Sequence, residues 1–175
     1  MFRKLVNEEL GRISVEEFKS APKEDVVVIL DNVRSQHNIG SAFRSCDAFR
    51  AAKLYLCGIS AVPPSAQIHK SALGAEFSMD WEYCENTMDV VQKLHSDGYV
   101  IVSVEQAEGS TALGDFSRMA GGKYALIFGN EVHGVAQDVV SASDICLEIP
   151  QFGTKHSLNV SVSVGIVLWE LLGRQ

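Results

Sequence analysis

Apolar residues along this chain form short continuous runs, and between the runs they recur at helical spacing. The first run, Val26–Leu30, is rich in β-branched side chains, which is typical of a strand buried on both faces. In the next segment, residues 38–49, the apolar residues fall on one face of a helix. This pair of segments predicts a strand followed by a helix.

The same alternation continues to the end of the chain. It predicts further strands at residues 53–57, 99–104, 123–128 and 145–149, and further helices at residues 87–96, 135–141 and 158–172. Strands that alternate with helices are typical of an α/β fold with a mainly parallel sheet flanked by helices. We therefore expect one domain of this class from residue 25 onward.

The last predicted helix, residues 158–172, is apolar on more than one side. Leu158, Val162 and Trp169 fall on one stripe, and valines and leucines extend the apolar surface around it. Such a helix needs cover on two sides, from a second subunit or from deep burial within one chain. Residues 1–24, by contrast, are charged with widely spaced apolar positions, and we expect them to form one or two short helices packed on the domain or an arm.

Composition limits the classes of protein and site. The chain has 175 residues, 46% of them hydrophobic, which fits one globular domain. It has no apolar run of the roughly 20 residues that span a membrane, and its first ten residues are too polar for a secretory signal, so we expect a cytoplasmic protein. The four cysteines and five histidines show no metal-ligand spacing, which predicts buried thiols and no metal.

The formal net charge of −7 argues against strong nonspecific binding to RNA, because such affinity comes mainly from Lys and Arg at phosphates. The charges are unevenly distributed, however. Between Val33 and Ala75 there are three arginines and two lysines but only one acid, Asp47. This segment is either a basic surface for RNA or an ordinary solvated surface.

Polar side chains gather in three segments, residues 38–44, 128–134 and 149–161. The second and third directly follow predicted strands, and strand ends are where α/β folds place ligand sites. Gly129 permits close approach to the backbone, and Ile149 and Leu158 are suited to apolar walls of a pocket. Without further information a turn glycine and two core aliphatic residues explain the same pattern.

Five polar residues of these segments are candidates for chemistry, and each has a structural alternative. Asn38 begins one predicted helix and Ser157 precedes another, and both are suited to helix capping. Arg44 is otherwise a solvated surface charge, and Glu131 a solvent-exposed loop acid. Asn159 offers an amide for hydrogen bonds to RNA or to neighbouring loops.

The three segments, in this order, resemble the motifs of the SpoU branch of the SPOUT RNA methyltransferases, from about residue 26 to the end of the chain. The resemblance implies transfer of a methyl group from S-adenosylmethionine to a ribose 2'-hydroxyl of tRNA or rRNA. It implies catalytic roles for Asn38, Arg44, Glu131, Ser157 and Asn159, and cofactor contacts at Gly129, Ile149 and Leu158. Glu131 is expected to hold a catalytic Arg or Asn in place.

Arg44 matches the arginine that is proposed to activate the ribose hydroxyl in this family. An arginine side chain holds its proton at neutral pH, so we expect Arg44 to bind a neighbouring phosphate and to stabilise the developing alkoxide. We expect this residue to be essential in either role.

The resemblance also implies features that sequence patterning does not show. The methyltransferase domain should span residues 25–175 and contain a C-terminal deep trefoil knot at about residues 126–175, although general topology rules make knots rare. The protein should act as a homodimer. The chain has few elements outside the core, which slightly favours tRNA over rRNA. Two alternatives remain open: a non-catalytic RNA-binding or assembly protein with this fold, and a small-molecule methyltransferase.

Overall fold

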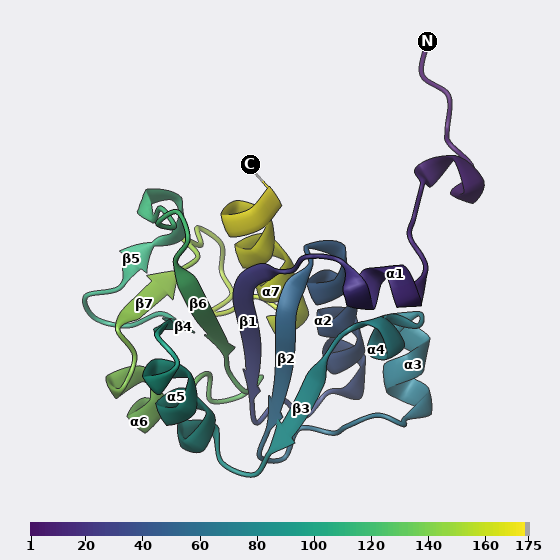
Figure 1. Cartoon of the computed structure of the whole chain (residues 1–175). Coiled ribbons are helices and arrows are strands. Elements are labelled where there is room, and N and C mark those ends of the chain that lie inside the picture. Colours follow the sequence, from purple (N-terminus) through teal and green to yellow (C-terminus); the bar gives the residue numbers. More distant parts are fainter. Residues whose placement is uncertain (174–175) are drawn as a thin grey trace.

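The computed structural model describes residues 1–173, and its centre is a seven-stranded sheet in which all strand pairs are parallel (Figure 1). The strand order is β3-β2-β1-β6-β4-β7-β5. The strands are β1 (Glu24–Asp31), β2 (Ala51–Cys57), β3 (Trp81–Cys84), β4 (Tyr99–Val104), β5 (Thr111–Ala112), β6 (Lys123–Phe128) and β7 (Ile145–Glu148). The predicted α/β fold with a mainly parallel sheet is confirmed. Residues 174 and 175 of the predicted domain lie outside the described residues.

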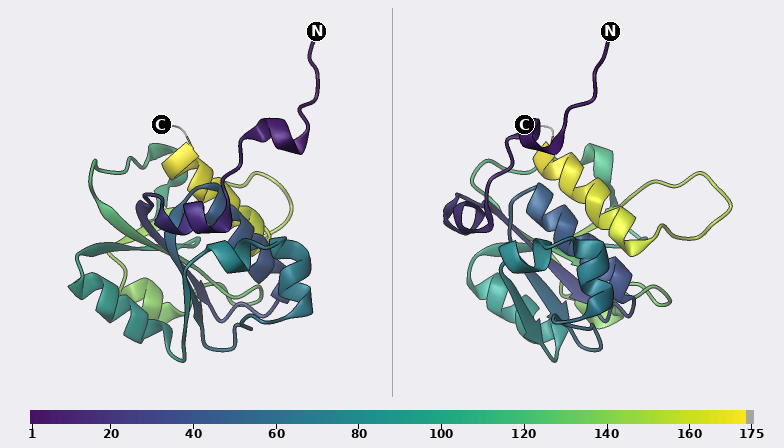
Figure 2. Two further views of the ribbon diagram at one scale, coloured as in Figure 1. Left: turned by 45° about the vertical axis from the view of Figure 1, so that its right-hand side comes forward. Right: turned by 90° about the vertical axis from the view of Figure 1, so that its right-hand side faces the viewer.

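Helices cover both faces of the sheet (Figures 1 and 2). They are α1 (Val15–Ser20), α2 (Gln36–Ala48), α3 (Ala66–Ala72), α4 (Ala75–Ser78), α5 (Thr87–Ser96), α6 (Gln137–Ser141) and α7 (Val160–Leu168), with single turns η1 (Asn7–Leu10), η2 (Leu113–Asp115) and η3 (Trp169–Gly173). Alternate residues of β1 enter two cores, because successive side chains of a strand point to opposite faces. Val26 and Val28 pack in the core with α2 and α7, whereas Val27 and Ile29 pack in the core with α5 and α6.

The pattern predicts long elements better than short ones. The bounds of α5, β4 and β6 are those that the sequence predicts. Four short elements, α3, α4, β3 and β5, are not predicted. None of them exceeds seven residues, and β3 and β5 carry no continuous apolar run.

Neither Asn38 nor Ser157 caps a helix, so the structural alternatives for these two residues are wrong. Helix α2 begins at Gln36, and the hydroxyl of Ser35 accepts a hydrogen bond from the backbone N–H of Asn38, so that Asn38 lies inside the first turn. Helix α7 begins at Val160, and its N-cap is Asn159, which accepts from the backbone N–H of Ser161 at 2.9 Å. Ser157 therefore caps neither helix.

The N-terminal residues extend from the body of the molecule (Figure 1). Residues 1–17 are exposed, and the first buried side chain is Phe18 of α1. Within residues 1–173 the structure has no helix with the length and apolarity required to cross a bilayer.

The rest of the chain covers one side of helix α7 and leaves the other side exposed. Val164 and Val167 are fully buried, whereas Val162 is 49% exposed and Trp169, in the turn that follows, is 56% exposed. Burial within one chain thus accounts for part of the apolar surface of this helix and leaves the rest open to solvent.

Two of the four cysteines have the expected burial. Cys46 and Cys57 are fully buried, and Cys84 and Cys146 are partly buried. Burial raises the pKa of Cys57 to about 12, which makes its thiolate a minor species at neutral pH. The thiols of Cys46 and Cys57 therefore serve as packing groups of the core.

Candidate functional site

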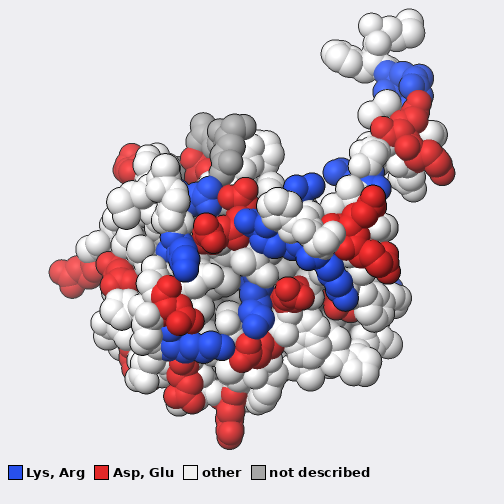
Figure 3. All heavy atoms as spheres, in the orientation of Figure 1, with Lys and Arg blue, Asp and Glu red and all other residues white. Residues whose placement is uncertain are grey.

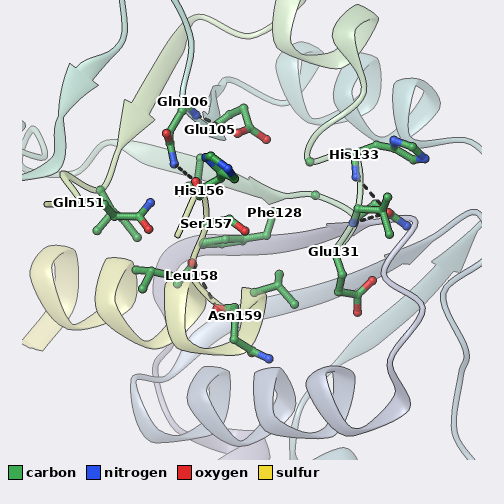
Figure 4. A pocket seen from close by; sticks show the side chains of 18 residues that line it. Glu105, Gln106, Phe128, Glu131, His133, Gln151, His156, Ser157, Leu158 and Asn159 are labelled. Atoms are coloured by element: carbon green, nitrogen blue, oxygen red, sulfur yellow. Dashed lines mark hydrogen bonds between the residues drawn. The ribbon is translucent and has the colours of Figure 1, made fainter. Parts of the chain in front are cut away.

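A cavity of about 500 Å³ lies at the carboxyl ends of β4, β6 and β7 and is bordered by the loops that follow β6 and β7 (Figure 4). We call it the strand-end pocket. Its floor is apolar and includes Phe128, Ile149 and Leu158, while Glu105 and Ser157 place polar groups at its wall. Its volume falls in the range of small-molecule sites, about 300–1,000 Å³.

All three residues predicted to contact a cofactor line the strand-end pocket: Gly129, Ile149 and Leu158. The geometry at Gly129 explains why this position lacks a side chain. A Cβ atom there would lie 2.0 Å from the backbone carbon of Gly134 and from the backbone nitrogen of Val135. The loop after β6 can therefore fold back against the end of its own strand, and this return shapes the pocket.

The loop after β6 is held by Asn130. Its side-chain N–H donates to the backbone carbonyl of Asn32 at 2.7 Å, and its carbonyl oxygen accepts from the backbone N–H of Val132 at 2.8 Å. Backbone hydrogen bonds between Asn130 and Gly134 close the turn. Glu131 thereby lies at the tip of a turn that is fixed against the end of β1.

Glu131, Asn38 and Asn159 form a chain of hydrogen bonds that joins three segments, and we call it the polar relay. The Asn38 amide N–H donates to Glu131 Oε1 at 3.1 Å, and Asn38 Oδ1 accepts from the Asn159 amide at 3.1 Å. Glu131 also accepts from the backbone N–H groups of Arg34 and Ser35 at 3.1 and 3.0 Å. Residues far apart in sequence are thus brought together at the edge of the strand-end pocket.

The relay affects the charge state of Glu131. Partial burial would by itself raise the pKa of this carboxyl, but the hydrogen bonds from the backbone of Arg34 and Ser35 and from Asn38 outweigh burial and lower it below the ordinary value. Glu131 is consequently a carboxylate acceptor at neutral pH. Asn38 uses one donor and one acceptor in the relay, which leaves a second N–H and a second lone pair for a substrate.

Arg44 and Ser157 lie apart from the relay. Arg44 is exposed on α2, six residues after Asn38, and within residues 1–173 its side chain has no hydrogen bond or ion pair. Ser157 lines the strand-end pocket, and its hydroxyl likewise has no hydrogen bond to a described residue. Both side chains are available to a bound molecule.

Glu105 and Gln106 line this pocket but lie outside the three polar segments of the sequence, whereas His133 and His156 belong to the second and third segments and line it as well. Gln106 donates to the backbone carbonyl of His156 at 2.7 Å and so ties the loop before α7 to the end of β4 (Figure 4). The signal that finds Glu105 and Gln106 is their position directly after a buried strand. Figure 2 shows the remainder of the loop before α7 projecting from the body.

Comparison with known proteins shows one consistent resemblance. The sequence model of the SpoU rRNA Methylase family matches residues 25–169. The chain is 33% identical over 153 residues to the tRNA (guanosine(18)-2'-O)-methyltransferase of Aquifex aeolicus, covering 85% of this chain and 69% of that protein. It is 32% identical over 145 residues to the 23S rRNA (guanosine-2'-O-)-methyltransferase RlmB of Nitrosomonas europaea, covering 83% of this chain and 55% of that protein.

Solved structures of SpoU and TrmH methyltransferases resemble this fold as well. The AdoMet-bound rRNA methyltransferase of Sinorhizobium meliloti superposes with a TM-score of 0.79 at 28% identity, over 85% of this chain and 56% of that one. The TrmH/SpoU tRNA modifying enzyme of A. aeolicus superposes with a TM-score of 0.77 at 29% identity, over 89% of this chain and 78% of that one. This chain thus spans little more than half of several of its relatives.

Proposed function

The chain belongs to the SpoU rRNA Methylase family, and from this premise we propose that it transfers a methyl group from S-adenosylmethionine to a ribose 2'-hydroxyl of tRNA or rRNA. The observation that carries the proposal is that the polar relay lies at the edge of the strand-end pocket, because Glu131 and Asn159 belong to both. The pocket holds Gly129, Ile149 and Leu158 in one cavity, and the relay fixes Asn38 at its edge. Relatives that methylate tRNA and rRNA share this fold.

The residues fit the cofactor by their chemistry. The apolar floor of the strand-end pocket suits an adenine ring, and the carboxylates nearby suit a cationic sulfonium. When bound, S-adenosylmethionine supplies a methyl group that is already activated toward a nucleophile. The protein has then to orient the ribose hydroxyl and to exclude water.

In the proposed mechanism Arg44 binds the phosphate next to the target ribose and stabilises the negative charge that develops on the 2'-oxygen. Asn38, held by Glu131 and Asn159, offers its remaining hydrogen-bonding groups to the RNA. Ser157 contributes a free hydroxyl at the pocket wall. RNA approaches over the basic segment that contains Arg34, Arg44 and Lys70. Figure 3 shows the side of the sheet that carries α5 and α6, on which basic and acidic side chains are interspersed, whereas α2 and Arg44 lie on the opposite side.

The proposal includes the organisation of the chain. Residues 25–175 form the methyltransferase domain, with a deep trefoil knot at about residues 126–175, and residues 1–24 form a short helical segment that packs on the domain through Phe18 of α1. The functional unit is a homodimer, and the open apolar surface at Val162 and Trp169 supports this assignment. Sedimentation as a monomer at micromolar concentration would contradict the dimer.

The test of function is transfer of labelled methyl from S-adenosylmethionine to unmodified tRNA and rRNA, with alkali-resistant dinucleotides scored as evidence of ribose methylation. We expect label in one RNA fraction. Arg44→Ala should reduce the rate at least about 100-fold, whereas Arg12→Ala, an exposed arginine outside the family match, should not. An Arg44→Ala protein with nearly normal activity would contradict the role of Arg44, and cofactor binding without transfer to either RNA would favour a non-catalytic protein.

A further inference from the structure

A second cavity, of about 600 Å³, lies beside α3 and α4 at the β3 edge of the sheet. We call it the α3–α4 cavity. Its walls include Pro64, the rings of His69, Phe77 and Trp81, and the side chain of Glu76. It shares no residue with the strand-end pocket.

The acid of this cavity has an unused hydrogen-bond acceptor. Glu76 is 6% exposed, its Oε1 pairs with His69 Nδ1, and its Oε2 has no hydrogen-bond partner among the described residues. A buried carboxylate oxygen without a donor is unusual and costs free energy. The His69 side chain, which is 62% exposed, can turn outward with little loss of packing and open the carboxylate to a ligand.

Aromatic rings form the walls around this carboxylate. Phe77 is 62% exposed, and its ring centroid lies 5.9 Å from that of His69. Trp81 is fixed from behind by an edge-to-face contact with Phe43 at 6.4 Å. An exposed ring beside a fixed ring is suited to stacking a planar group, and stacking on aromatic side chains is the common way in which proteins hold unpaired bases.

The cavity lies within reach of an RNA bound at the methyl-transfer site. The hydroxyl of Ser65, which caps α3, donates to the side-chain carbonyl of Gln36 in the first turn of α2, two residues before Asn38. In the sheet, β3 is three strand spacings from β6, or about 14 Å, and Trp81 lies at the level of Leu126, two residues before the end of β6. A nucleotide near the methylated one can therefore occupy the α3–α4 cavity while the target ribose lies at the strand-end pocket.

We propose that the α3–α4 cavity binds an unpaired guanine base of the RNA substrate, stacked against Phe77 and Trp81, with the Glu76 carboxylate as acceptor. Guanine is the common base whose Watson–Crick edge offers a ring N–H beside an exocyclic amine, two adjacent donors that match a carboxylate. This inference rests on the proposed function and extends it to a second contact with the same RNA.

The test uses the intrinsic fluorescence of Trp81. The chain has two tryptophans, so Trp169→Phe leaves Trp81 as a single reporter. In that protein we expect guanosine monophosphate to quench the emission saturably and adenosine monophosphate to do so weakly. Glu76→Gln should weaken guanosine monophosphate binding at least about tenfold, the loss expected for hydrogen bonds to a charged group. Quenching by an arginine peptide but not by the nucleotide would identify a protein-binding site and overturn the proposal.

Methylation kinetics supply the second readout. Glu76→Gln and Phe77→Ala should raise the KM for RNA more than they lower kcat, whereas Phe2→Ala, another exposed phenylalanine, should change neither. The exposed Phe77 keeps the test valid if Glu76→Gln fails to fold. If both variants methylate RNA with normal KM values, the proposed guanine binding at the α3–α4 cavity is overturned, and the proposed function is not affected. Binding of guanosine monophosphate by a chain that methylates no RNA would overturn the proposed function alone.

Discussion

Glu131 and Glu76 line two separate cavities, and they differ in how the fold uses their carboxylate oxygens. Glu131 is exposed, yet it accepts hydrogen bonds from Asn38 and from two backbone N–H groups. Glu76 is buried, yet one of its oxygens has no partner among the described residues. The hydrogen bonds of Glu131 support the positioning role proposed for it, and the unpartnered oxygen of Glu76 is the observation from which we infer a ligand at the α3–α4 cavity.

The largest expected effect comes from a change that damages both cavities. Gly40 lies in α2, and a Cβ atom there would lie 2.4 Å from the backbone carbonyl oxygen of Ile68 and 2.1 Å from Ser71 Oγ in α3. Gly40→Ala should therefore destabilise the protein by about 3 kcal/mol in urea unfolding. It should also slow methyl transfer and weaken binding of guanosine monophosphate, because α2 carries Asn38 and α3 borders the second cavity.

A second helical glycine serves as the control. At Gly165 in α7 the atom nearest to an added Cβ would be Ser45 Oγ at 3.8 Å, which is ordinary contact. Gly165→Ala should leave stability unchanged or raise it by up to about 1 kcal/mol, the usual gain from alanine in a helix. A Gly40→Ala protein as stable as Gly165→Ala would contradict the close packing of α2 on α3.

The next effect separates the two cavities. Glu131→Ala removes the acceptor that holds Asn38, and a displacement of about 1 Å at a reacting group can reduce the rate about 100-fold. Methyl transfer should fall by that order, while quenching of Trp81 by guanosine monophosphate stays normal. Glu16→Ala, which removes an exposed acid of α1, is the matched control. Loss of nucleotide quenching in Glu131→Ala would show that the cavities are coupled and would contradict their separation.

The same two acids show how far the sequence predicts this molecule. Glu131 belongs to a motif that follows the long apolar strand β6, and both periodicity and family resemblance mark it. Glu76 lies in the four-residue helix α4, between elements too short for the hydrophobic pattern to detect. The sequence therefore does not predict the α3–α4 cavity, because its residues are brought together only by the packing of α3, α4 and β3.

Within the strand-end pocket the sequence predicts which residues gather but not how they pair. Strand ends and motif order place Gly129, Ile149 and Leu158 at one edge of the sheet, where the structure has them. The caps are a different matter. Ser35 and Asn159 take the capping positions that Asn38 and Ser157 were suited to, because a shift of two or three residues in a helix start is not fixed by propensity.

A smaller effect tests the two roles of Asn159. Its carbonyl oxygen caps α7, and its amide donates to Asn38 Oδ1. Asn159→Ala loses both roles and should cost about 1 kcal/mol of stability together with activity. Asn159→Asp keeps a good N-cap but loses the donor, so stability should remain near normal while methyl transfer falls. Equal activity of Asn159→Asp and the unmodified protein would show that the hydrogen bond from Asn159 to Asn38 is not needed for methyl transfer.

The smallest effect is a dependence of stability on pH that comes from Glu131. The hydrogen bonds of the relay outweigh partial burial and lower the pKa of Glu131 below 4.5, its ordinary value. A carboxyl whose pKa is lower in the folded chain stabilises the fold above the unfolded pKa, and this contribution is lost as pH falls through the folded pKa. The free energy of unfolding of the unmodified protein should therefore exceed that of Glu131→Gln at about pH 7, and the difference should shrink below pH 4.5. A Glu131→Gln difference that persists in acid would mean that the relay does not depend on the charge of Glu131.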